Sequence, residues 1–167
     1  MVRMTTLTLE NFKRYSGKHV IPLSGEQGSL TLIAAQNGIG KTTTLDSIHI
    51  AIHGKRGFRN RYPKKRFDDW LMNAYSVDSQ DQEDHSMTFA LDLECPIHGQ
   101  VHVERTFWLL EEEDGGIIEE FGVTIDGRLL EIEEGERRTD VSERWLEAFM
   151  PLAVMRRFLV DGERLAE

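Results

Sequence analysis

The chain has 167 residues, 40% of them hydrophobic and 29% charged, which predicts one globular domain large enough to bury a core. Its 20 Lys and Arg against 29 Asp and Glu give a net charge of −9, which excludes the uniformly basic surface of a general nucleic-acid binder. Cys95 is the single cysteine, and no apolar run reaches the ~20 residues of a membrane span, so we expect a cytoplasmic protein without disulfides or membrane contact.

The first elements are predicted to be strands. Residues 7–9 and 19–21 alternate apolar and polar side chains and are joined through 14–17. Residues 30–34 are more continuously apolar and predict a third strand, buried on both faces. After a glycine-rich break, apolar positions recur at helical spacing and predict a helix that Gly54 can end. Its apolar face consists of Leu45, Ile48, His49 and Ile52.

A basic segment follows this helix. Phe58 and Tyr62 are interleaved among its charges, so the segment could contact DNA phosphates and stack on bases. The alternative is a solvated loop, and the sequence leaves both open. The basic residues are Lys55, Arg56, Arg59, Arg61, Lys64, Lys65 and Arg66.

The second half of the chain is predicted to be an antiparallel meander followed by a helix. Side chains alternate over 89–93, 101–107 and 121–125, with turn residues between these segments. Asp140 and Glu143 form a capping box that opens a helix stopped by Pro151. The acidic stretches 77–86, 111–116 and 131–136 read as loops. Cys95, His98 and His102 are too few for a closed zinc site, and the three tryptophans are expected in the core or at a lobe interface.

The segment 35–43, with the sequence Ala-Gln-Asn-Gly-Ile-Gly-Lys-Thr-Thr, predicts a phosphate-binding loop. Gly38 and Gly40 allow main-chain N–H groups to converge on an anion. Lys41 supplies a positive charge for the β- and γ-phosphates and Thr42 a hydroxyl for Mg²⁺, at the positive end of the helix dipole. Ala35 replaces the usual first glycine of the motif. The alternative is that the segment is a glycine-rich turn that only links a strand to a helix.

Two further stretches carry a family resemblance. Residues 9–13, Leu-Glu-Asn-Phe-Lys, together with 37–48, resemble the amino-terminal lobe of the SMC/Rad50/RecN class of ABC-type ATPases. Residues 157–165, Arg-Phe-Leu-Val-Asp-Gly-Glu-Arg-Leu, resemble the DndD family, the ATPases of bacterial DNA phosphorothioate modification. The resemblance implies an α/β (α+β) lobe over 1–167, with a mixed sheet around the P-loop helix plus the antiparallel meander. It also implies a coiled coil and a C-terminal lobe outside this chain.

The resemblance implies a nucleotide site for ATP and Mg²⁺. Asp161 occupies the position of the family's Q-loop glutamine, where it would act in catalysis and ligate Mg²⁺ together with Thr42. An aspartate there departs from Rad50 and agrees with DndD. The residues implied to hold the nucleotide are Lys13, Asn37, Gly38, Ile39, Gly40, Lys41, Thr42 and Thr43.

The implied function is the ATP-binding half of a DNA-associated ATPase that hydrolyses ATP as a full-length dimer, the isolated chain being very slow. Its expected partners are its own C-terminal lobe, a second copy joined through ATP, DNA, and other DNA-modification subunits, in the bacterial nucleoid. The alternatives are a Rad50- or SMC-type repair ATPase, a small-molecule P-loop kinase, and a structural or DNA-binding module that does not hydrolyse ATP.

Overall fold

The computed structural model describes residues 2–23, 40–76, 85–110 and 116–158. The elements are β1 (Arg3–Phe12), β2 (Tyr15–Pro22), α1 (Lys41–Arg61), α2 (Phe67–Ala74), β3 (Ser86–Cys95), β4 (Gly99–Leu109), β5 (Ile117–Ile125), β6 (Arg128–Leu129), α3 (Arg138–Phe149) and α4 (Leu152–Phe158). This strand and helix content confirms the α+β class. None of the described helices has both the length and the apolarity needed to cross a membrane.

The strands form one sheet in the order β2-β1-β3-β4-β5-β6. Each strand pair in the described residues is antiparallel, and β3, β4 and β5 are the predicted meander. The strand predicted at 30–34, which would make the sheet mixed, lies outside the described residues. Alternation puts one apolar set on a single face, and burying each large side chain stabilises the fold by roughly 1.5–3 kcal/mol. That buried set comprises Leu7, Leu9, Phe89, Leu91, Leu93, Val101, Val103, Phe107, Phe121 and Val123.

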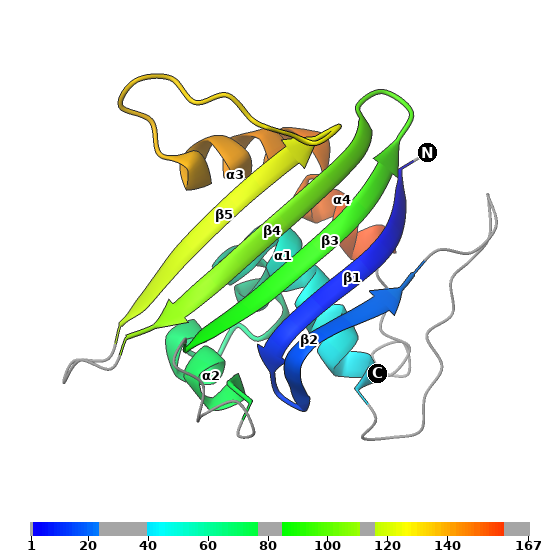
Figure 1. The fold of residues 1–167 in the computed structure, drawn as a ribbon. Helices are drawn as coiled ribbons and strands as arrows, with labels where there is room; N and C mark the ends of the chain where they lie inside the picture. The colour runs from blue at the N-terminus through cyan, green and yellow to red at the C-terminus, as the bar shows by residue number, and fades with distance from the viewer. Residues whose placement is uncertain (1, 24–39, 77–84, 111–115, 159–167) are drawn as a thin grey trace.

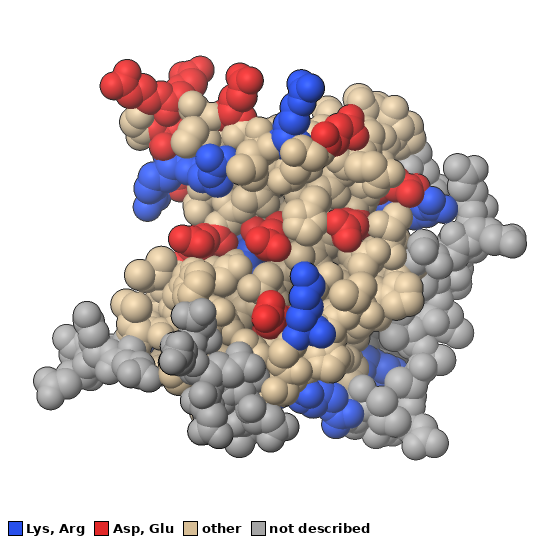
Figure 2. Space-filling view, viewed as in Figure 1, with Lys and Arg blue, Asp and Glu red and all other residues tan. Residues whose placement is uncertain are grey.

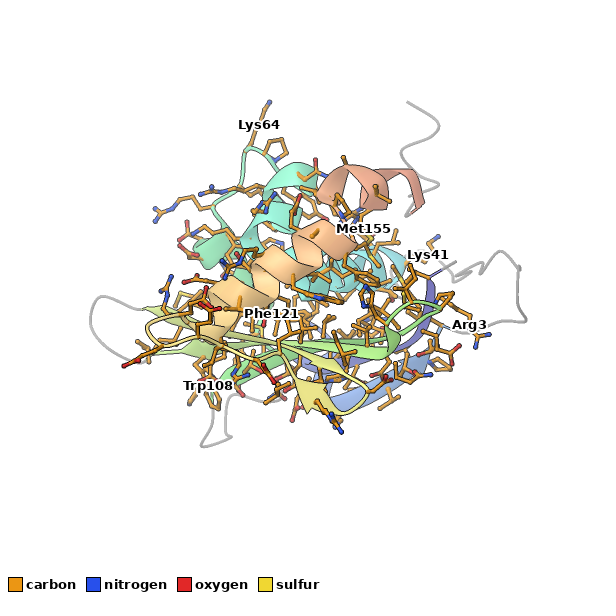
Figure 3. The ribbon with its side chains drawn as sticks, turned by 90° about the horizontal axis from the view of Figure 1, so that it is seen from above. Arg3, Lys41, Lys64, Trp108, Phe121 and Met155 are labelled. Atoms are coloured by element: carbon orange, nitrogen blue, oxygen red, sulfur yellow. The ribbon has the colours of Figure 1, made fainter. Side chains whose placement is uncertain are left out.

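The molecule has two layers. All helices lie behind or above the sheet in Figure 1, and Figure 3 shows them gathered on one side of it. The other face of the sheet is open to solvent, and its side chains include Glu104 and Glu120, both exposed. Figure 2 looks onto this open face and shows acidic side chains spread over it. The core therefore lies between the sheet and α1, α2 and α3.

Helix α1 reverses direction at Gly54. Gly54 has φ 48° and ψ −132°, which are not helical values, although helical hydrogen bonding resumes and continues to Arg61. An unbroken helix would carry Arg61 roughly 22 Å along the axis from Asp46, at about 1.5 Å per residue. Instead, the Arg61 Nε atom lies 2.8 Å from Asp46 Oδ1. The predicted stop at Gly54 is thus confirmed for the first helical axis, and a second short axis folds back beside it.

Arg105 of β4 fills the space at this reversal. Its side chain is fully buried, and its guanidinium lies 3.8 Å from the centre of the Phe121 ring. It donates to the carbonyl oxygens of Ala51 and Ile52, which precede the break in α1, and pairs with Glu119 of β5. A carbonyl that loses its helical partner needs another donor, and Arg105 supplies it.

Helix α3 begins three residues earlier than the sequence predicts. The structure places its N-cap at Arg137, so the prediction that Asp140 caps the helix is wrong. Asp140 lies in the first turn, where its carboxylate interacts favourably with the positive end of the helix dipole. It also accepts a 2.8 Å hydrogen bond from Arg137 Nε. Glu143, the other half of the predicted box, faces Arg105 at 3.4 Å. The helix ends at Phe149, before Pro151, as predicted.

Candidate nucleotide-binding site

The site is built around the amino terminus of α1. Gly40 is the N-cap residue and has φ 110°, a conformation that L side chains rarely adopt. Gly40 has no side chain with which to cap the helix, and the first N–H groups of an α-helix have no partner within the helix itself. Lys41 and Thr42 occupy the first turn and are half-buried. Figure 3 shows Lys41 at the edge of the helical layer.

The hydroxyl groups along this helix are used in two ways. Thr44 Oγ1 donates to the Gly40 carbonyl at 3.1 Å, and Ser47 Oγ donates to the Thr43 carbonyl at 2.7 Å. Both therefore bond back onto the helix, and Thr43 is itself buried. Thr42 remains at the accessible end, the position at which a P-loop hydroxyl ligates Mg²⁺.

The turn between β1 and β2 is the second component. Asn11 is buried with φ 54°, and its side chain accepts from the Gly17 N–H at 2.9 Å and donates to the Ser86 carbonyl at 3.1 Å. The Lys13 N–H donates to the Ala74 carbonyl at 2.6 Å. Asn11 thus builds the turn, and the bond to Ala74 fixes the Lys13 backbone.

Asp46 of α1 links this turn to the returning half of the helix. Its side chain is 2% exposed. Oδ2 lies 3.4 Å from Lys13 Nζ, Oδ1 lies 2.8 Å from Arg61 Nε, and the Tyr62 hydroxyl lies 3.0 Å from each oxygen. Burial and the neighbouring carboxylate both raise the pKa of Tyr62, so the phenol stays protonated and donates.

Sequence reasoning missed Asp46. A signal was present, because Asp46 is the only charged residue between Lys41 and Lys55. A lone carboxylate in a helix whose neighbouring residues carry no charge predicts a buried cationic partner. The partner is Arg61 because the helix reverses at Gly54, and the local sequence pattern does not predict this reversal.

The local charge suits a phosphate group. Two cations, Lys13 and Arg61, face the carboxylate of Asp46 beside the first turns of α1. The Lys13 side chain is 32% exposed and can be reached by a ligand. Cationic side chains beside a helix amino terminus that begins at a glycine are an arrangement suited to binding an anion. Lys41, Thr42 and Lys13 would hold the phosphates, with Mg²⁺ at Thr42.

The structure brings some of the predicted site residues together. Gly40, Lys41, Thr42 and Thr43 form the start of α1, and Lys13 reaches the same helix one turn later through Asp46. The Tyr15 hydroxyl lies 3.3 Å from the place a Cβ on Gly40 would occupy, so the strand turn closely approaches the helix start. Other predicted residues lie outside the described part of the chain: Asn37, Gly38, Ile39 and Asp161.

Comparison with protein families agrees with this geometry. A family model described as an AAA domain matches residues 6–148, which is most of the chain. The chain belongs to the AAA domain family. This is a family of P-loop ATPases that includes SMC-like proteins, and membership indicates nucleotide binding, usually with Mg²⁺. A search of curated proteins finds no match.

The basic segment of this AAA domain does not present Phe58 and Tyr62 for stacking on DNA bases. Phe58 is 1% exposed and packs on Trp70 and Phe67, and Tyr62 bonds Asp46, so neither ring is presented to a base. Arg61 is buried in its pair with Asp46. The prediction of base stacking by Phe58 and Tyr62 is therefore wrong. Several basic side chains of the segment are exposed away from the core: Arg59, Lys64, Lys65 and Arg66.

A separate hollow of about 430 Å³ lies on the open face of the sheet. Glu104 and Glu120 line it together with His102 and Arg138. Two carboxylates repel a triphosphate, and the hollow is on the face opposite α1, so it does not belong to the nucleotide site. His102 pairs with Asp92 at 2.7 Å, whereas His98 packs on Trp145, so these two histidines serve different contacts.

Proposed function

We propose that this AAA domain is the ATP-binding half of an SMC-like, DNA-associated ATPase related to DndD. The observation that carries the proposal is the placement of Lys41 and Thr42 in the first turn of α1, with Lys13 paired to Asp46 about one turn further along the same helix. The family match supports ATP binding. The segment 157–165 and the aspartate at position 161 favour DndD over a Rad50- or SMC-type repair ATPase, which is the alternative. Asp161 would complete the Mg²⁺ site and act in catalysis, with hydrolysis requiring the C-terminal lobe and a second copy.

Binding of Mg-ATP should stabilise the protein, and Lys41→Ala should abolish that stabilisation. The wild type is expected to melt several degrees higher with ligand at about 100 times its Kd, because ligand binding to the folded state alone is then worth about 2.7 kcal/mol. The measurement is the melting temperature with and without Mg-ATP. Lys55→Ala is the matched control, since Lys55 forms an exposed pair with Asp68 away from the site.

Equal ligand-induced shifts in wild type and Lys41→Ala would refute the site. A shift that Lys41→Ala removes and Lys55→Ala retains would support it. The small-molecule kinase alternative predicts phosphate transfer to an added acceptor by this chain alone. The non-hydrolysing module predicts no shift in any variant.

DNA is proposed as a partner of the exposed basic strip, which consists of Arg59, Lys64, Lys65 and Arg66. These side chains project from a protein whose net charge is −9, so contact should be confined to this strip. Figure 3 shows Lys64 directed away from the sheet. The anisotropy of a labelled duplex should rise with protein at low salt and fall steeply between about 50 and 200 mM salt, as expected for phosphate contacts. Lys64→Gln/Lys65→Gln should weaken this binding, and unchanged binding would exclude the strip.

A further inference from the structure

The two cations that face Asp46 are not equivalent. Arg61 lies closer, with Nε at 2.8 Å from Oδ1, whereas Lys13 Nζ lies 3.4 Å from Oδ2. The Arg61 side chain is 6% exposed and that of Lys13 is 32% exposed. Arg61 is therefore the enclosed partner of the carboxylate, and Lys13 is the partner that a ligand can reach.

The Lys13 side chain can move while its backbone stays fixed. Its N–H is bonded to the Ala74 carbonyl, and its φ of 53° holds it in the turn. The ammonium lies 5.0 Å from the centre of the Phe12 ring and 5.2 Å from that of Trp70. These rings support a lysine ammonium without a fixed hydrogen-bond direction, so Nζ can turn from Asp46 toward an anion at the helix terminus.

The availability of Lys13 depends on Arg61. A buried carboxylate must be paired, because an unpaired buried charge is strongly unfavourable. With Arg61 present, Asp46 is already neutralised and Lys13 can leave it. Without Arg61, Asp46 would hold Lys13 as its remaining cation.

We propose that Arg61 is a positioning residue of the nucleotide site, which neutralises Asp46 and so leaves the charge of Lys13 available to phosphate. This inference rests on the proposed function, since it needs nucleotide at the terminus of α1. It gives a buried arginine of the basic segment a role in nucleotide affinity that acts through another side chain. The reversal at Gly54 is what brings Arg61 to this position.

The test measures the Kd of a fluorescent ATP analogue with Mg²⁺ in a set of variants. Arg61→Gln should weaken binding about tenfold, within the range of coupled neighbouring residues. The same substitution in a Lys13→Ala background should change the Kd by less than about twofold, because its effect passes through Lys13. Arg56→Gln, on the same segment and exposed, carries the same charge change and should leave the Kd unaltered, because Arg56 pairs with Glu147 of α3.

The double variant Asp46→Asn/Arg61→Gln distinguishes an effect of the unpaired Asp46 charge from a loss of affinity caused by structural damage. It removes the carboxylate together with its partner, so Lys13 is no longer retained and the affinity should return to within about threefold of wild type. Circular dichroism and melting curves establish that each variant is folded. If Arg61→Gln does not fold, the double variant alone decides, since a tenfold loss in it would overturn the inference.

Three outcomes are distinguishable. Loss in Arg61→Gln with recovery in the double variant supports the inference. An equal loss from Arg61→Gln with and without the Lys13→Ala substitution, or no recovery, overturns it while leaving nucleotide binding established. Equal binding by wild type and Lys41→Ala would instead refute the proposed function itself.

Discussion

At the scale of single residues, buried polar groups determine which elements meet. Asp46, Arg105 and His53 are all nearly inaccessible, yet each belongs to a different set of contacts. His53 Nδ1 lies 3.8 Å from Glu147 Oε2, and its Nε2 has no hydrogen-bond partner among the described residues. Burial, followed by the charges of Arg56 and Arg105, lowers the pKa of His53 from 6.5 to about 4. The imidazole is therefore neutral in the folded protein at neutral pH.

Stability should consequently fall in mild acid. The unfolded chain takes up a proton on His53 below pH 6.5, whereas the folded protein does not until about pH 4. The free energy of unfolding is therefore unaffected by His53 above pH 6.5 and falls between there and pH 4, by roughly 3 kcal/mol in total. Urea unfolding at about pH 7.5, 6 and 5, on either side of the ordinary histidine pKa, measures it. His53→Gln should flatten the decline and exposed His19→Gln should not; parallel declines in wild type and His53→Gln would assign it to other groups.

At the scale of elements, the sequence predicts those whose signal is local. Alternation at Leu7 and Leu9, and at Val101 and Val103, identifies strands because only one sheet face is buried. Helix α2 gives too weak a signal to predict, since its eight residues form barely two turns. The predicted cap at Asp140 is wrong because a carboxylate suits a first turn as well as a cap position.

Arg105 is a residue whose burial follows from the local sequence pattern but whose partners do not. Its position alternates with those of Val103 and Phe107, whose side chains face the core, so its burial could be predicted from the sequence. Its partners come from α1, β5 and α3, however, and no local pattern can name them.

The reversal within α1 depends on glycine for two reasons. Gly54 has positive φ, and a Cβ there would lie 2.6 Å from Arg105 Nη1. Gly54→Ala should therefore lower the free energy of unfolding by about 3 kcal/mol or more, by combining backbone strain with displacement of a buried guanidinium. Gly127→Ala is the matched control, because Gly127 has φ 77° with no atom within 4 Å of a Cβ, and should cost about 1 kcal/mol. Chemical denaturation of both variants decides, and equal costs would contradict the role of Arg105.

At the scale of the whole molecule, the described helices all cover the same face of the sheet, and the candidate site lies at one edge of this helical layer. Arg105 joins the two layers through four elements: its own strand β4, the break in α1, β5 through Glu119, and α3 through Glu143. The α+β class was predictable from composition and periodicity. The candidate nucleotide site was predictable only as a loop and a helix terminus, because Asp46 and Arg61 meet through a chain reversal.

The aromatic support beneath Lys13 has an optical consequence. The three tryptophans are distributed over α2, β4 and α3, and Trp70 has the Lys13 ammonium 5.2 Å from its ring centre. Indole emission responds to a nearby charge, so departure of this ammonium would alter the fluorescence of Trp70 while that of Trp108 and Trp145 stays constant. A Trp108→Phe/Trp145→Phe protein should show a spectral shift on addition of Mg-ATP that Lys13→Ala removes. Trp70 would then report nucleotide binding without any attached label.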